Sequence, residues 1–64
     1  MSREGYINGA KALIALAQDN CNSKDLVAIR YVAIILSNHM IKASLKNDAE
    51  FIDVLMRLVE VFKI

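Results

Sequence analysis

The chain has 64 residues, is 56% hydrophobic, and carries eight basic and seven acidic residues for a net charge of +1. A chain this short forms one domain, so residues 1–64 are treated as a single helical unit, and the high apolar content excludes intrinsic disorder. One cysteine and one histidine exclude an internal disulfide and a Cys/His zinc site within the chain, and the interleaved charges lack the basic stripe of a nucleic-acid-binding protein.

The first apolar-periodic segment predicts an amphipathic helix over residues 3–19. Ser2 is suited to be its N-cap, and Glu4 places negative charge near the positive end of the helix dipole. Gly5 and Gly9 have GxxxG spacing, which indicates either a closely packed neighbour or loose first turns. The apolar face, with residues at 3.6-residue spacing, consists of Tyr6, Ile7, Ala10, Leu13, Ile14 and Ala17.

A polar break at residues 19–22 precedes a longer helix, predicted over residues 23–46. Asn22 is a suitable N-cap, and Cys21 and Leu26 occupy the two positions of a hydrophobic staple. The helix is apolar around nearly its whole circumference, which is typical of a buried helix. Its first stripe contains Ile29, Val32, Ala33, Leu36, Met40 and Ala43, and its second contains Val27, Ile34, Ile41 and Leu45.

Between these stripes runs a polar seam of Arg30, Ser37 and Ser44, which recur every seven residues. A polar line at this spacing can set the register of a helical bundle, and a buried arginine requires an acidic partner from the third helix or from a second chain. The alternative is that the seam lies exposed along a solvated groove.

The third helix is predicted over residues 48–63, with Asn47 as its N-cap and Glu50 at the third helical position, as in a capping box. Asp48 and Asp53 add negative charge. Capping explains this cluster, because the alternating ligands and the glycine turn of a calcium loop are missing from the sequence. The apolar face consists of Phe51, Ile52, Val54, Leu55, Leu58, Val59, Val61 and Phe62.

Few side chains are candidates for chemistry. His39 has apolar neighbours within one helical turn and no orienting partner, so we predict a boundary residue and not a general base. Cys21 lies before a helix N-terminus near Lys24, which favours the thiolate, but Asp19 and Asp25 oppose it. We therefore predict no catalytic, metal or cofactor site and no enzyme.

The sequence also contains features that bear on where in the cell the protein resides. The longest uncharged stretch, Tyr31–Ile41, is about half the length that a bilayer requires, and the first residues lack the pattern of a signal peptide. With a single free thiol, these features favour a reducing cytoplasm and no membrane contact.

The predicted fold is all-α, a three-helix chain forming a helical bundle completed by dimerisation. The two outer helices can cover one broad side of the central helix, so its second stripe would pack on a second copy. The alternative is a compact monomer in which the outer helices straddle the central helix and cover both stripes.

We expect a non-enzymatic regulator or adaptor that binds another protein through its apolar helix faces, as a homodimer. The alternatives are a small structural subunit of a larger assembly and a DNA-binding regulator whose Lys42 and Lys46 meet their symmetry mates. Leu36→Glu is expected to disrupt the assembly. The residues expected to contact a partner are Val27, Ile34, Leu36, Met40, Ile41, Phe51, Leu55, Leu58 and Phe62.

Overall fold

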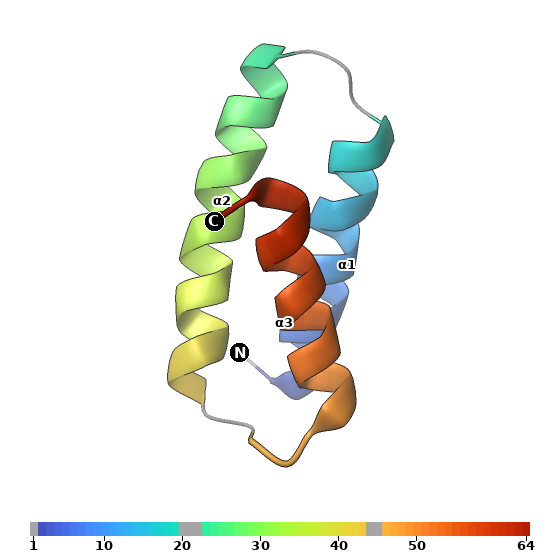
Figure 1. Ribbon diagram of the computed structural model, residues 1–64, viewed down its shortest axis with the longest axis vertical. Coiled ribbons are helices and arrows are strands. Elements are labelled where there is room, and N and C mark those ends of the chain that lie inside the picture. The colour runs from blue at the N-terminus through green and yellow to red at the C-terminus, as the bar shows by residue number, and fades with distance from the viewer. Residues whose placement is uncertain (1, 20–22, 44–45) are drawn as a thin grey trace.

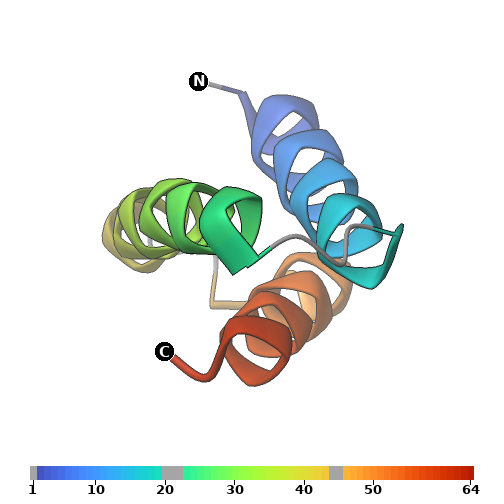
Figure 2. The ribbon, with the colours of Figure 1, turned by 90° about the horizontal axis from the view of Figure 1, so that it is seen from above.

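The computed structural model describes residues 2–19, 23–43 and 46–64, and these ranges contain three helices and no strand. The helices are α1 (Arg3–Asp19), α2 (Ser23–Ala43) and α3 (Ala49–Phe62). They pack as a bundle in which α3 lies in front of α1 and α2 runs along their side (Figure 1). Seen from above, the three helices stand at the corners of a triangle (Figure 2). The predicted all-α, three-helix fold is confirmed.

The start of α1 follows the sequence prediction. The Ser2 side-chain oxygen accepts a hydrogen bond from the Gly5 backbone N–H at 3.2 Å, and the Ser2 carbonyl accepts one from Tyr6 at 3.0 Å. The Ser2 side chain therefore satisfies one backbone donor that has no intrahelical partner, and the Ser2 carbonyl accepts the first i→i−4 bond of the helix.

The second helix differs from the prediction at its end. It was predicted to reach residue 46, but α2 is described to Ala43 and Lys46 lies in a turn. The predicted N-cap Asn22 and the staple residue Cys21 lie outside the described residues, as do residues 44–45.

The predicted N-cap of the third helix was wrong by one residue. Asp48, not Asn47, has the extended backbone of an N-cap, and its Oδ1 accepts a hydrogen bond from the Phe51 N–H at 3.1 Å. An ionised carboxylate is a stronger acceptor for an N-terminal backbone N–H than an amide oxygen. Glu50 does not complete a capping box but pairs with Arg3 of α1.

The core takes one face from each helix. The predicted apolar face of α1 is confirmed, because four of its six residues are buried and the other two pack against the core. The buried hydrophobic residues are Ile7, Ala10, Leu13 and Ile14 of α1, Ala33, Leu36 and Met40 of α2, and Phe51, Val54, Leu58 and Phe62 of α3.

A polar cluster joins the N-terminal ends of α1 and α3. The Arg3 guanidinium donates to both carboxylate oxygens of Asp48, the Nη2–Oδ1 distance being 3.1 Å, and to Glu50 Oε1 at 2.8 Å. Beside it, the rings of Tyr6 and Phe51 meet edge to face, with centroids 5.9 Å apart. The hydrogen bonds from Arg3, followed by that from the Phe51 N–H, hold the pKa of Asp48 below its usual range.

Acidification is expected to weaken this cluster. A carboxyl group whose pKa is depressed in the folded chain stabilises the fold above its unfolded pKa of about 3.9, and this contribution is lost as the pH falls through the folded pKa. The thermal midpoint should therefore fall as the pH is lowered from about 5 to about 2.

The control for this prediction is Asp48→Asn, which retains an oxygen acceptor but cannot ionise. The variant should have a lower midpoint at neutral pH and a shallower fall on acidification. Equal pH profiles for the two proteins would show that Asp48 does not carry the effect.

The end of α3 is closed by a residue in the left-handed conformation. Lys63 has φ 54° and ψ 47°, its N–H bonds the Glu60 carbonyl at 3.3 Å, and the Ile64 N–H bonds the Val59 carbonyl at 3.1 Å. These two bonds form a Schellman motif, in which this position is usually glycine because a Cβ atom is unfavourable there.

Lys63→Gly is accordingly expected to raise the free energy of unfolding by about 1 kcal/mol. The urea midpoint measures the change. Lys63→Ala, which removes the charge but keeps the Cβ atom, should leave the midpoint near that of the natural chain. If both variants shift it equally, the cause is the lysine side chain and not the backbone conformation.

Candidate protein-binding surfaces

Five of the nine predicted contact residues lie in the interior and not on the surface. Each is at most 9% exposed, because it packs against the other two helices of its own chain. These five side chains contribute mainly to the core of the single chain, although Leu36 also lines a hollow between α1 and α2. Their role as partner contacts stays a prediction. They are Leu36, Met40, Phe51, Leu58 and Phe62.

The other four predicted residues remain accessible. Val27 and Ile41 are exposed, and Ile34 and Leu55 are partly exposed. The second apolar stripe of α2 is therefore largely open in the single chain, while the first stripe supplies the core. Leu45, the last residue of the second stripe, lies outside the described residues.

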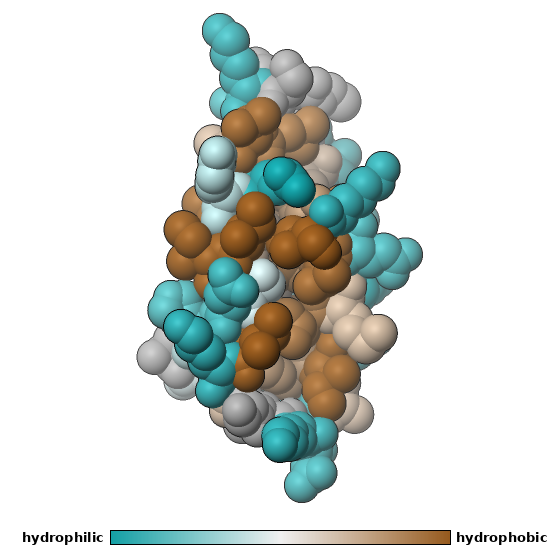
Figure 3. Space-filling model, turned by 60° about the vertical axis from the view of Figure 1, so that its left-hand side comes forward, coloured by the Kyte–Doolittle hydropathy of each residue, from teal (hydrophilic) through white to brown (hydrophobic). Residues whose placement is uncertain are grey.

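The open stripe of α2 continues onto α3. One hollow of about 410 Å³ is lined by Ile41, Leu55, Met56, Val59 and Glu60, and a smaller one of about 130 Å³ by Val27, Arg30, Tyr31 and Ile34. On this side, hydrophobic residues run down the molecule in a broken band with hydrophilic side chains at its edges (Figure 3). We define the α2/α3 face as Val27, Tyr31, Ile34, Ile41, Ile52, Leu55, Met56 and Val59.

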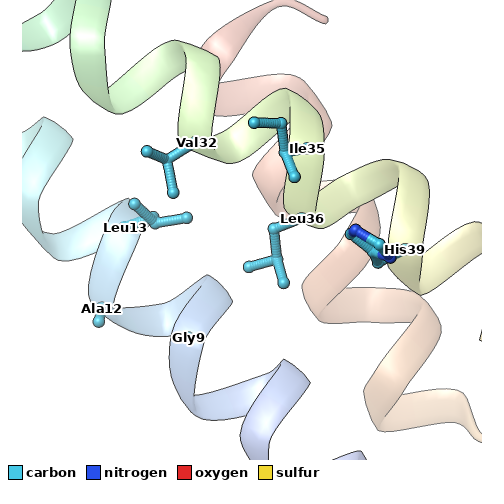
Figure 4. A pocket seen from close by; sticks show the side chains of 7 residues that line it. All are labelled: Gly9, Ala12, Leu13, Val32, Ile35, Leu36 and His39. Carbon is cyan, nitrogen blue, oxygen red and sulfur yellow. The ribbon is translucent and has the colours of Figure 1, made fainter. Parts of the chain in front are cut away.

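A second apolar surface lies between α1 and α2. The α1/α2 groove has a volume of about 510 Å³ and is lined by Gly9, Ala12, Leu13, Val32, Ile35, Leu36 and His39. Leu13 and Leu36 point into the space between the helices, and His39 lies at one end (Figure 4). A Cβ atom on Gly9 would lie 3.6 Å from Leu36 Cδ2, an ordinary contact. The helix that packs near this glycine is thus α2 of the same chain.

The polar seam of α2 borders α3, and among the described residues of the single chain no acidic side chain pairs with Arg30; a partner from a second chain stays a prediction. Ser37 is buried, and its hydroxyl donates to the Ile34 carbonyl of its own helix at 2.8 Å. Arg30 Nε donates to the Phe62 carbonyl at 3.1 Å, which satisfies a backbone acceptor at the C-terminal end of α3. Ser44 lies outside the described residues.

A metal site would require several His, Cys, Asp or Glu side chains close together. Within the part of the chain that the structure describes, no group of three or more His, Cys, Asp and Glu side chains could hold a metal ion. His39 is exposed at the end of the apolar groove, where its neighbours are hydrocarbon side chains. Neither observation supplies the acid–base pair that catalysis would require.

The apolar character of α2 is also comparable to that of a membrane-spanning helix. The segment Lys24–Ala43 has the length and the mean hydropathy, 1.3, of a membrane-spanning helix. Of the 18-residue stretch over which this hydropathy is averaged, 22% is buried in the bundle. Core helices of proteins without membrane segments pass the same test, so length and composition alone do not place α2 in a bilayer. In this structure its buried side packs on α1 and α3.

The two surfaces differ in size. The α2/α3 face carries five large hydrophobic side chains classed as exposed, whereas the side between α1 and α2 carries three, Leu16, Val32 and Ile35. Neither surface has the charge pattern of a nucleic-acid site. Comparison of the chain with protein-family models, with curated proteins and with solved structures gives no match.

Proposed function

We propose that this chain is a non-enzymatic regulator or adaptor that works by binding other protein chains through apolar helix faces, as a homodimer. The supporting observation is that ten large hydrophobic side chains among the described residues are 36–67% exposed. Eight of them lie on the α2/α3 face and beside the α1/α2 groove. Exposed apolar patches of this kind mark interaction sites.

The size of the chain supports the same proposal. A compact monomer of 7.2 kDa should expose about 4,100 Å², and this chain exposes 4467 Å². The exposed area is only slightly larger than expected for a compact monomer, but the exposed surface includes large apolar side chains. Association that removes these side chains from water contributes a favourable free energy of about 25 cal/mol per Å² of apolar surface buried.

Two separate apolar surfaces suit an adaptor. One surface can hold a second copy while the other binds a different protein, because α2 presents them on different sides. The groove between α1 and α2 is lined mostly by apolar residues, so in this proposal it receives one amphipathic helix, whose apolar residues would meet Val32 and Ile35.

The test is the composition of the native complex, measured by mass after mild purification of a tagged copy from its own host. We expect two copies of this chain with a stoichiometric amount of one foreign protein. Recovery of free monomer alone would contradict the proposal.

The control is a variant that carries a charge on both the α1/α2 groove and the α2/α3 face. The double variant Ile35→Glu/Ile41→Glu changes two exposed residues of α2, so it should fold but lose its partners. A variant that stays folded and keeps the same complex would show that neither surface is used.

A further inference from the structure

The area of the α2/α3 face fits a self-association surface. Its five most exposed residues, Val27, Tyr31, Ile41, Ile52 and Met56, present roughly 570 Å² if a fully exposed large side chain has about 200 Å². Each partner of a standard protein complex buries about 800 Å², of which about 65% is apolar in homodimers. The face therefore supplies the apolar area that a homodimer needs. The three exposed side chains beside the α1/α2 groove present roughly 320 Å², about 60% of that apolar area.

The α2/α3 face carries both a protruding side chain and a hollow. Tyr31 is 67% exposed, the most exposed of the large hydrophobic residues, and stands on the N-terminal half of α2. The larger hollow is lined on its α2 side by Ile41, which lies ten residues further along α2 and so about 15 Å from Tyr31. A two-fold contact pairs each feature with its complement on the other copy. If two α2 helices pack antiparallel about the level of Leu36, each Tyr31 faces the hollow of the other copy.

The charges of the face are complementary in the same arrangement. Glu60 lines the larger hollow, and Arg30 lines the smaller one beside Tyr31. In the antiparallel pair, the Glu60 carboxylate can accept a hydrogen bond from the second copy's Tyr31 hydroxyl and lies on the side of its Arg30. Opposite charges that meet across an interface fix register and suppress wrong partners.

We infer that the α2/α3 face binds a second copy of this chain, with α2 antiparallel to α2 and each Tyr31 inserted into the hollow of the other copy formed by Ile41, Leu55, Met56 and Val59. This inference rests on the proposed function and deepens it, since it assigns the α2/α3 face to self-association. The α1/α2 groove then lies outside the dimer contact and stays open to a different protein.

Sedimentation equilibrium of the full chain tests the inference. The natural chain should sediment as a dimer of twice 7.2 kDa at concentrations of tens of micromolar. Tyr31→Ala should raise the dimer dissociation constant by at least about 30-fold, as expected for a central aromatic contact. Tyr31→Phe, which loses only the hydroxyl, should raise it by a factor of a few.

The matched control uses two isoleucines of the same helix. Ile41 on the α2/α3 face is 60% exposed and Ile35 at the groove is 57% exposed, so glutamate at either position should leave the fold intact. Ile41→Glu should sediment as a monomer and Ile35→Glu as a dimer, with circular dichroism showing that both are folded.

The reverse result, a dimeric Ile41→Glu and a monomeric Ile35→Glu, would overturn the inference but leave the proposed function standing. A natural chain that stays monomeric at about 100 μM would also overturn it. The native complex would then decide the proposed function separately.

Mixing two variants tests the reciprocal geometry. Tyr31→Ala lacks the inserted ring, and Met56→Glu obstructs the hollow, so each should be monomeric alone. A mixed dimer contains one intact pair, the Tyr31 of one variant in the unobstructed hollow of the other, so the mixture should partly re-associate. If the natural chain dimerises and the mixture does not, the contact is not reciprocal and the proposed geometry is wrong.

Discussion

Leu36→Glu is expected to unfold the chain, whereas the same change at the neighbouring Ile35 leaves it folded. Leu36 is buried between the helices and Ile35 is largely exposed. Loss of a buried leucine costs about 2–5 kcal/mol, and a carboxylate without a partner adds several more. A 64-residue domain has a total stability of roughly 3–10 kcal/mol, which this substitution would exhaust.

Far-UV circular dichroism and a thermal melt of the two variants measure this difference. The burial of Leu36 also changes the expected effect of Leu36→Glu, which was predicted from the sequence to break the assembly. In this fold, the variant would fail to dimerise because the single chain would no longer fold. If Leu36→Glu melts cooperatively near the midpoint of the natural chain, the packing of α2 described here is wrong.

Phe51→Ala is expected to cost about 3–5 kcal/mol, a large part of the total stability. The ring is buried in the core and meets the Tyr6 ring edge to face. Its removal leaves a cavity where α1 and α3 meet and where little rearrangement can fill the space. Urea unfolding should show a much lower midpoint or no folded baseline.

Phe51→Leu separates packing from the aromatic contact. Leucine keeps most of the buried volume, so the change in packing should lower the free energy of unfolding by less than about 1.5 kcal/mol. Loss of the contact between the two rings should lower it by roughly a further 0.5–1.5 kcal/mol. Tyr6→Leu in the same background should then cost less than it does alone. Equal costs in both backgrounds would mean that the two rings do not interact.

The sequence was most informative where a helix has one apolar side. The apolar face of α1 and its bounds follow directly from 3.6-residue spacing, because only one direction can face a core. For α2, spacing separates two stripes but cannot say which is buried. That choice depends on where α1 and α3 lie, which is a property of the whole fold.

Contact residues could not be separated from core residues for the same reason. Phe51, Leu58 and Phe62 are large and apolar, which describes a core residue and a surface contact equally well. Tyr31 and Met56, both exposed on the α2/α3 face, were not among the predicted contacts. Local pattern also gave no sign of the Arg3 cluster, because Arg3 and Asp48 are 45 residues apart in sequence.

The pairing of α1 with α3 has a consequence for the order in which the fold can form. Arg3 and Asp48 bring together segments separated by 45 residues, so the loop between them must close before their contacts form. During synthesis, α1 must therefore wait for α3 to leave the ribosome. The hollow between α2 and α3 therefore forms only after α3 has been synthesised. Nascent chains that still lack α3 also lack part of the surface proposed for pairing.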